Sequence, residues 1–333
     1  MPDSDPFRRP VCDLVVSIIN FRTCDLTLAC VRSVLDELGR LDGVTAEVIV
    51  VDNRSDDGSA EAIADWIAAQ VPPVPVRLVL SSTNSGFSGG HNQAIGAQRA
   101  AHYLLMNSDG LLRPGMLGNL LAAARAAPAA GLFAPRIEHE DGTVQTSCFG
   151  LPNPASEVIR GAVTAPVTRL LGRFDVPLPV PPPPERIGWA SFACILLSGR
   201  MIDALGPLDE GYFLYFEDVE YCMRARRAGW RLVHVPEARM VHFRGGSGPV
   251  KKLAGERRRL PGYFYASRSR YFYQAGGRLG LLAANLGWML GRGIAALRPL
   301  TGRERVPGIA GEWRDIWINF LTPLGDRRAP PGS

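Results

Sequence analysis

The chain has 333 residues, of which 46% are hydrophobic and 21% charged, which suits a large core in one extended domain or two smaller ones. Its formal net charge of +5 suits an anionic ligand or a membrane surface, but it is too small to indicate binding to nucleic acid. The cysteines show neither a CxxC pair nor metal-ligand spacing, so we expect free thiols in a reducing cytoplasm. The first ten residues lack an apolar signal core, which argues against export.

The first half of the chain alternates strand-like apolar runs with helical patterns. Strands that are buried on both faces and joined by helical crossovers predict an α/β fold, with a mostly parallel central sheet flanked by helices. The predicted strands are 14–19, 47–51, 76–80 and 102–106, and the predicted helices are 25–38, 59–70 and 89–101.

Polar side chains follow each predicted strand, at the edge where such sheets bind ligands. They include Asn20, Asp52, Asn84 and Asp109. A lone Asp after a strand is usually a turn former or a helix cap, but four polar strand ends in one sheet indicate a binding site. Asp52 could accept the imide N–H of a pyrimidine base, and Asp109 could hold a divalent cation on a diphosphate together with His242. No dinucleotide fingerprint or phosphate loop is present, which disfavours a hydride-transfer enzyme and a P-loop ATPase.

An acidic pair, Glu217-Asp218, directly follows the aromatic run 212–216. A carboxylate that is kept partly dry has a raised pKa and can serve as a general base near neutral pH. The same pattern also suits a capped helix over 218–228, with acids in its first turn, arginines in its last and a glycine beyond. The residue types alone leave both interpretations open.

Two further segments have distinctive composition. Arg244, with the glycines that follow it, and the basic stretch 251–259 suit either a lid over a diphosphate or a solvated surface loop. The proline-rich segment 176–184 predicts a stiff surface loop between the nucleotide-facing sheet and the acidic segment. A polyproline ligand for another protein is the alternative for that segment.

The order of these motifs resembles family 2 glycosyltransferases of the GT-A fold, and in particular their bacterial rhamnosyltransferase-like branch. The resemblance covers about residues 14–275 and rests on several motifs in the right order. They are Val50-Val51-Asp52-Asn53, Asn84-x-Gly86-Phe87, Leu105-Met106-Asn107-Ser108-Asp109, Gly206–Glu210, Tyr212–Asp218, Arg224, Gly229-Trp230, Pro236-Glu237-Ala238, His242 and Gly245-Gly246-Ser247.

The resemblance implies an inverting, divalent-metal-dependent transfer of a sugar, with rhamnose favoured. The donor would be a nucleotide-diphosphate sugar, dTDP-rhamnose or a UDP-sugar, and the acceptor a hydroxyl of a glycan or a lipid-linked glycan. In this interpretation Mg²⁺ or Mn²⁺ is the cofactor. The implied roles are pyrimidine recognition by Asp52 with Asn20 and Asn84 nearby, metal binding by Asp109 and His242, diphosphate binding by Arg244, deprotonation of the acceptor by Asp218, and support by Glu217.

Some residues depart from the family pattern. Asn107 stands where the first acid of the DXD-type metal motif is expected, so one fewer charge would hold the ion. Glu220 replaces a common Asp, and Ser191–Cys194 replaces a glycine-containing segment, which affects the acceptor site. Rival interpretations are hexosyl or galactofuranosyl transfer from a UDP-sugar, a sugar-nucleotide pyrophosphorylase or hydrolase, and a non-catalytic nucleotide-sugar or glycan-binding scaffold.

The expected organisation is a GT-A domain followed by a helical extension. The domain ranges are 11–275, divided into a nucleotide-binding half 11–110 and an acceptor half 111–275, and 276–333 for the extension.

The extension contains an apolar run, 279–291, that falls short of the roughly 20 residues needed to span a bilayer. Trp288, Trp313, Trp317 and Phe320, beside flanking arginines, favour a helix lying in a membrane interface. The alternatives are packing on the core or on a second subunit of a homo-oligomer. We therefore expect a cytoplasmic protein that is peripheral on the inner face of the cell membrane.

Overall fold

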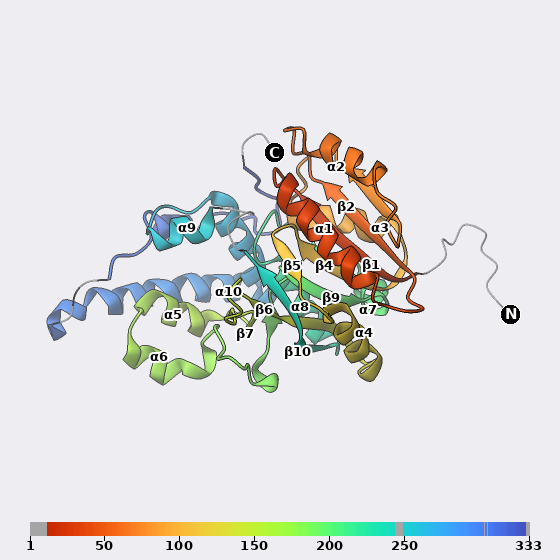
Figure 1. Ribbon diagram of the computed structural model, residues 1–333. Helices are drawn as coiled ribbons and strands as arrows, with labels where there is room; N and C mark the ends of the chain where they lie inside the picture. The colour runs from red at the N-terminus through yellow and green to blue at the C-terminus, as the bar shows by residue number, and fades with distance from the viewer. Residues whose placement is uncertain (1–11, 244–248, 303, 305, 331–333) are drawn as a thin grey trace.

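The computed structural model describes residues 12–243, 249–302, 304 and 306–330, and a mixed eight-stranded sheet lies at its centre (Figure 1). The strand order is β3-β2-β1-β4-β9-β6-β10-β5, and a separate two-stranded sheet joins β7 to β8. The strands are β1 (Cys12–Asn20), β2 (Ala46–Asp52), β3 (Val76–Leu80), β4 (Ala100–Asn107), β5 (Gly110–Leu112), β6 (Ala130–Glu138), β7 (Cys148–Phe149), β8 (Trp189–Ala190), β9 (Cys194–Ser198) and β10 (Arg231–His242).

The first four strands are parallel, as the alternation of strands and helices predicts. The register pairs Asn20 at the end of β1 with Asp52 at the end of β2, and it pairs Ile19 with Asn107 on the other side. The polar strand ends therefore meet at one edge of the sheet. Beyond β4 the sheet becomes mixed, because β9 is antiparallel to both β4 and β6, and β10 is parallel to β6 but antiparallel to β5.

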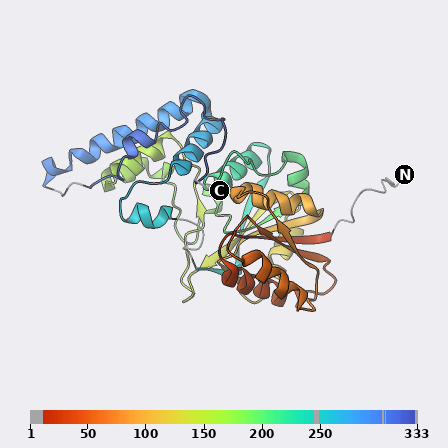
Figure 2. The same ribbon diagram turned by 90° about the horizontal axis from the view of Figure 1, so that it is seen from above.

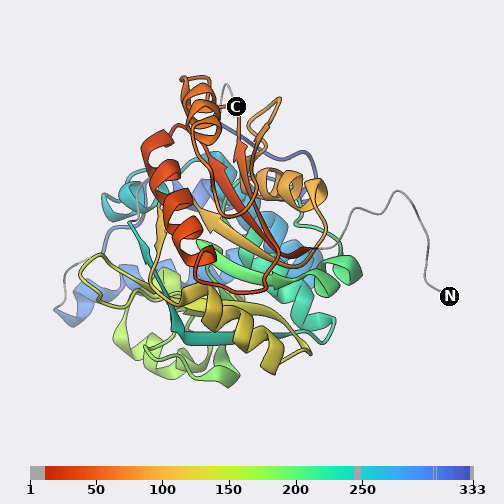
Figure 3. The same ribbon diagram turned by 45° about the vertical axis from the view of Figure 1, so that its right-hand side comes forward.

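Helices cover both faces of the sheet and bury its apolar side chains in two clusters. The cluster on one face contains residues of α1, α2 and α4, and the cluster on the other contains residues of α3, α7 and α8. Figure 3 shows α1 and α4 on the same side of the sheet. The helices are α1 (Cys24–Leu38), α2 (Ser59–Ala68), α3 (Gly86–Ala97), α4 (Met116–Ala126), α7 (Gly199–Leu205) and α8 (Glu217–Arg227).

The predicted helix 89–101 is wrong at both ends. Helix α3 begins earlier, at Gly86, and the alanines after its end belong to β4. Ala100 pairs with Cys12 of β1, so strand pairing within the sheet outweighs the helical propensity of an alanine-rich segment.

A second group of helices projects to one side of the sheet, with α10 and α5 side by side (Figure 2). Helix α10 kinks at Gly276 and Gly277, whose backbone angles are not helical, so its second half begins at Arg278. These helices are α5 (Pro154–Ala162), α6 (Ala165–Leu171), α9 (Val250–Gly255), α10 (Gly262–Ala296) and α11 (Glu312–Asp315).

Buried charged groups tie α10 to α5. Arg268 donates to Glu157 at 2.6 Å and to Asn285 at 2.7 Å, and Arg160 also binds Glu157, at 2.7 Å. Arg160 reaches Glu312 of α11 as well. Charged groups are buried only when they are paired, so this network fixes how the helices lie against each other.

Part of the C-terminal segment packs on the rest of the chain, although Trp313 is 68% exposed. Trp288, expected to lie in a membrane interface, is buried in a cluster with Phe213, Tyr263 and Ile316. After α11 the chain returns to the sheet, where Arg327 donates to the Ser85 carbonyl at 2.8 Å. The proline-rich segment is anchored too, because Pro177 pairs with Phe149 and Leu178 is buried.

One helix, Gly262–Leu300, is long and apolar enough to cross a membrane by length and composition. The whole helix is therefore long enough to cross a bilayer, although the apolar run 279–291 alone is too short. Core helices of soluble proteins pass the same test, and a third of the most apolar window is buried here (33%).

Candidate active site

The ends of β1 and β2 hold a buried carboxylate in a fixed orientation. Asn20 donates to Asp52 Oδ1 at 2.7 Å, and the hydroxyl and backbone N–H of Ser55 donate to the same carboxylate at 2.6 and 3.0 Å. The side-chain Oδ1 of Asn20 in turn accepts from the Thr27 hydroxyl at 2.8 Å. A carboxylate oriented in this way can accept one further hydrogen bond, such as that from an imide N–H.

The turn after β3 is held by the side chain of Asn53. Its amide donates to the Asn84 side chain and the Gly86 carbonyl, both at 3.0 Å, and its oxygen accepts from the backbone and hydroxyl of Ser85. Asn84 therefore shapes the turn, and its oxygen also accepts from the Gly86 N–H at 3.1 Å.

The same turn touches the segment that carries the acidic pair. Phe87 donates its backbone N–H to the Phe213 carbonyl at 2.9 Å. Gly86 has a φ of +71°, and a Cβ on it would lie 2.1 Å from that carbonyl oxygen. Only glycine fits this conformation and this close approach, so the strand-end turn and the acidic segment are packed together.

Asp109 and His242 are neighbours although they are far apart in the sequence. Strands β5 and β10 pair His242 with Gly110, and Phe243 donates its backbone N–H to the Asp109 carbonyl. His242 Nε2 lies 3.1 Å from Asp109 Oδ1, and both side chains are largely buried. An imidazole and a carboxylate at this distance could share one cation.

The residues present suit a cation that is shared with a diphosphate. In the described part of the chain no cluster of three or more His, Cys, Asp or Glu side chains could hold a metal ion. Mg²⁺ usually takes only one or two protein carboxylates, together with waters and phosphate oxygens. Asp109 and His242, with Asn107 nearby on the cavity wall, would thus supply part of a coordination shell that the substrate completes.

The backbone in front of the acidic pair is strained. Tyr215 and Phe216 have φ values of +71° and +67°, a left-handed conformation that is uncommon for aromatic residues. Strain of this kind persists where the surrounding structure fixes it, and it clusters at functional sites. Helix α8 starts at Glu217, so the strained turn places Glu217 and Asp218 in the first helical turn.

The two carboxyl groups differ in their surroundings. Burial raises the pKa of Asp218 to about 7, although the backbone N–H groups of Val219 and Phe192 favour its charged form. Burial, and then the charge of Asp218, raise the pKa of Glu217 well above its ordinary value. Glu217 Oε2 is buried without a hydrogen-bond partner among the described residues. Near neutral pH, Asp218 is therefore poised to exchange a proton, and the raised pKa of Glu217 favours its protonated form.

A cavity of about 960 Å³ brings several of these residues together. Glu217, Asp218, Asn107 and His242 all line it. Asp52, Asn20, Asn84 and Asp109 are not on its wall; the strand-end turn reaches it through Phe87.

The basic stretch divides into two parts. Lys251 and Lys252 line the cavity. Arg257 instead donates to the Pro307 carbonyl, and Arg259 forms a bidentate ion pair with Asp315 at 2.7 and 2.8 Å. Arg244 and the glycines after it lie outside the described residues.

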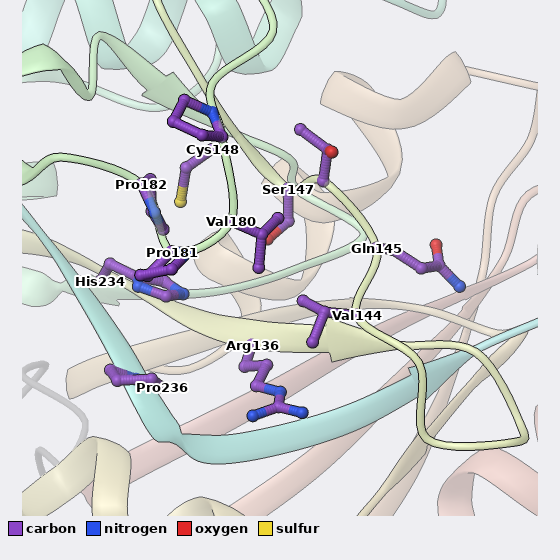
Figure 4. A pocket seen from close by; sticks show the side chains of 12 residues that line it. Arg136, Val144, Gln145, Ser147, Cys148, Val180, Pro181, Pro182, His234 and Pro236 are labelled. Atoms are coloured by element: carbon purple, nitrogen blue, oxygen red, sulfur yellow. The ribbon is translucent and has the colours of Figure 1, made fainter.

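Gln145 is a site residue that the sequence motifs did not reveal. Its amide donates to the His242 carbonyl at 2.8 Å and to the Glu138 carbonyl at 2.9 Å, so it holds the end of β10 in place. It lines the large cavity and also a smaller one of about 150 Å³ beneath the proline-rich segment. Figure 4 shows its side chain directed away from Pro181. A single Gln in an irregular segment carries no periodic signal, and only the tertiary structure reveals its position.

Comparison with known proteins decides the family. Residues 15–149 match the family model described as glycosyl transferase family 2. An N-acetylglucosaminyl-diphospho-decaprenol L-rhamnosyltransferase of Mycobacterium tuberculosis is 31% identical over 274 residues, which cover 75% of this chain and 81% of that protein. The chain belongs to glycosyltransferase family 2.

Solved structures give the fold of this family 2 glycosyltransferase. The mannosyltransferase PcManGT from Pyrobaculum calidifontis, in complex with GDP-Man and Mn²⁺, has a TM-score of 0.52 at 16% identity, covering 96% of this chain and 87% of that one. GalNAc-T7 with UDP, GalNAc and Mn²⁺ has a TM-score of 0.55 at 14% identity, covering 90% of this chain and 60% of that one. The predicted GT-A fold is confirmed.

Proposed function

We propose that this glycosyltransferase is an inverting enzyme that moves a sugar, rhamnose in the favoured case, from a nucleotide-diphosphate donor to a hydroxyl of a lipid-linked glycan. The observation that carries this proposal is the cavity in which Glu217 and Asp218 face the edge that bears Asn107 and His242. Donor-binding and acceptor-activating groups on one cavity suit a transferase, whereas a pyrophosphorylase or hydrolase would not need an acidic pair on a separate acceptor-facing segment.

Asp218 is proposed as the general base. Its carboxylate would take the proton of the acceptor hydroxyl while the acceptor oxygen bonds to the anomeric carbon of the donor sugar. The bond from that carbon to the diphosphate breaks, and the nucleoside diphosphate leaves with the electron pair. A single displacement needs only one base. Glu217, whose raised pKa favours the protonated form, would orient the acceptor or support Asp218.

The donor site is proposed to lie along the strand ends. Asp52, held by Asn20 and Ser55, would accept the imide N–H of thymine or uracil, while Asn84 shapes the adjacent turn. Asp109 and His242 would hold Mg²⁺ or Mn²⁺, which when bound neutralises charge on the diphosphate. Lys251 and Lys252 on the cavity wall support the same neutralisation. For Arg244 the same role remains a prediction.

The acceptor is proposed to carry a lipid. Support comes from the decaprenol named in the mycobacterial relative and from the net charge of +5. A lipid-linked acceptor would place this transferase on the cytoplasmic face of the cell membrane. The GT-A core, 11–275, would then perform the transfer, and the helical segment 276–333 would support it.

The decisive experiment compares Asp218→Asn with the unaltered enzyme. The substitution keeps the size of the side chain and removes the base, so transfer should fall by roughly 10²-fold or more while the Kd for the nucleotide stays the same. Calorimetry with dTDP and UDP, and a transfer assay with a lipid-linked acceptor, measure the two quantities.

Asp109→Ala is the matched control, because it should weaken metal-dependent binding of the nucleotide instead. Unchanged turnover in Asp218→Asn would contradict the proposed base. Nucleotide binding without transfer in the unaltered protein would favour a non-catalytic scaffold.

A further inference from the structure

The second half of α10 is apolar on two opposite faces. Its inward face packs on α5 so closely that a Cβ on Gly291 would lie 2.3 Å from the Val158 carbonyl oxygen. Its outward face is a stripe of exposed residues at helical spacing, which we name the outer stripe. The outer stripe consists of Leu279, Ala283, Leu286, Met289, Leu290, Gly293 and Leu297.

An outward face of this composition is unusual for a helix on a soluble protein. The outward face of such a helix is normally charged or polar, and a contiguous apolar surface marks an interaction site. Leu279 is 80% exposed, Leu290 60% and Leu297 59%. Each exposed position from 279 to 297 holds an apolar residue or glycine. In the described structure nothing covers these side chains.

The charges around the outer stripe suit an anionic surface. Arg278 precedes it and Arg298 follows it, and the chain from 262 to 301 contains no acidic residue. Basic side chains beside a leucine-rich face are the pattern of helices that lie in a membrane interface. In a symmetric contact between two copies of this helix, the same arginines would approach each other.

The inward face argues for contact with a membrane surface and against crossing it. Arg268 and Glu157 are buried between α10 and α5, and Arg292 donates to the Gly161 carbonyl. A crossing helix would have to bring these groups of α5 into hydrocarbon, where unsatisfied polar groups are costly. The second half of α10, roughly 28 Å long at 1.5 Å per residue, therefore offers lipid its outward face alone.

We propose that the outer stripe of α10 docks this protein on an anionic phospholipid surface, with its leucines at the acyl boundary and Arg278 among the headgroups. The face that would contact lipid lies opposite Trp288, which the sequence pattern favours for contact with a membrane. The inference rests on the contacts of α10 and not on the proposed reaction, so vesicle binding and sugar transfer can fail independently.

The test is flotation of the full chain with vesicles of an equal mixture of phosphatidylcholine and phosphatidylglycerol, and with vesicles of phosphatidylcholine alone. The unaltered protein should float with the mixed vesicles and less with the neutral ones. Leu290→Glu puts a charge in the centre of the outer stripe, so the partition coefficient should fall roughly tenfold or more. Val71→Glu, at a fully exposed position (100%) outside α10, adds the same charge and should float like the unaltered protein.

Three outcomes would overturn the proposal. The first is equal flotation of Leu290→Glu and the unaltered protein, or no flotation of either. The second is light scattering that shows a dimer which Leu290→Glu converts to a monomer without any binding to vesicles, since a second copy would then occupy the stripe. The third is resistance of the bound protein to alkaline carbonate, which would indicate a crossing helix. Circular dichroism must show that both variants are folded.

Discussion

At the scale of single residues, the acidic pair combines two carboxyl groups in different surroundings on one cavity. The strained turn at Tyr215 and Phe216 aims both groups at the cavity. Asp218 accepts hydrogen bonds from backbone N–H groups, which favour its charged form. Glu217 Oε2 has no hydrogen-bond partner among the described residues. Environment separates their roles, as in other sites where two neighbouring carboxyl groups act differently.

The pKa of Asp218 predicts the pH dependence of transfer. Because burial raises it to about 7, kcat/KM should rise with pH through that value, level off above it, and fall about tenfold for each pH unit below it. In Glu217→Gln this rise with pH should stay in place, because burial, and not a charge on Glu217, raises the pKa of Asp218. The absence of this rise in kcat/KM, or a strong shift of it along the pH axis in Glu217→Gln, would contradict the assignment of Asp218 as the base. Initial rates at saturating metal, measured over a range of pH, give this dependence of kcat/KM.

The raised pKa of Asp218 also makes the free energy of unfolding depend on pH. The folded pKa of Asp218 lies above the ordinary value of about 3.9, so the folded state binds a proton that the unfolded state releases between these two values. The free energy of unfolding should therefore fall as pH rises through this window. Urea titrations of the unaltered protein and of Asp218→Asn test this without any assay of activity, since the variant should lose this part of the slope.

At the scale of elements, the strand-end turn and the strained segment are coupled through Gly86. The donor side and the acceptor side of the site meet where Gly86 approaches the Phe213 carbonyl. A shift at this contact would move both the turn that ends at Phe87 and the backbone that positions Asp218.

Gly86→Ala should therefore impair activity as well as stability. The added Cβ must displace the Phe213 carbonyl, and a displacement of about 1 Å near reacting groups can lower kcat/KM by roughly 10²-fold. Gly58→Ala is the matched control, because Gly58 has a φ of +84° but nothing within 4 Å of its Cβ position. Both variants should lose roughly 1 kcal/mol of stability from backbone strain. Gly86→Ala should lose more, because its Cβ meets the Phe213 backbone, and it alone should lose turnover. Similar kinetics in the two variants would contradict the coupling.

At the scale of the whole molecule, the buried network of Glu157, Arg160 and Arg268 holds the projecting helices to each other. Burial alone would raise the pKa of Glu157, but the two arginines outweigh burial and lower it to about 2. The stabilisation is present above the ordinary Glu pKa of about 4.3 and is lost as pH falls towards 2. This network, and not helix propensity, decides how α10 presents its outer stripe.

Arg268→Ala should lower the free energy of unfolding by about 3–5 kcal/mol, because it removes one partner of a buried ion pair. Arg258→Ala removes an exposed ion pair with Glu256 and should cost at most about 1 kcal/mol. Urea unfolding at neutral pH compares the two variants. Equal losses would show that the buried network contributes no more than a surface pair.

The parallel half of the sheet could be predicted because its signals are local. Buried strands such as β2 are continuous apolar runs, and residues such as Asp52 end them, so the pattern gives both the strands and the edge where they meet. The end of α3 could not be predicted, because an alanine-rich segment suits a helix until a partner strand pairs with it.

The sequence by itself determined the α/β alternation, the polar strand ends and the acidic pair after an aromatic run, since each is a pattern of neighbouring residues. Only the tertiary structure decided which distant residues meet. It placed His242 beside Asp109 and Gln145 beneath the end of β10. It also turned Trp288 into the core and Leu290 outward. Both faces of α10 are apolar, so its periodicity could not distinguish them until α5 covered one.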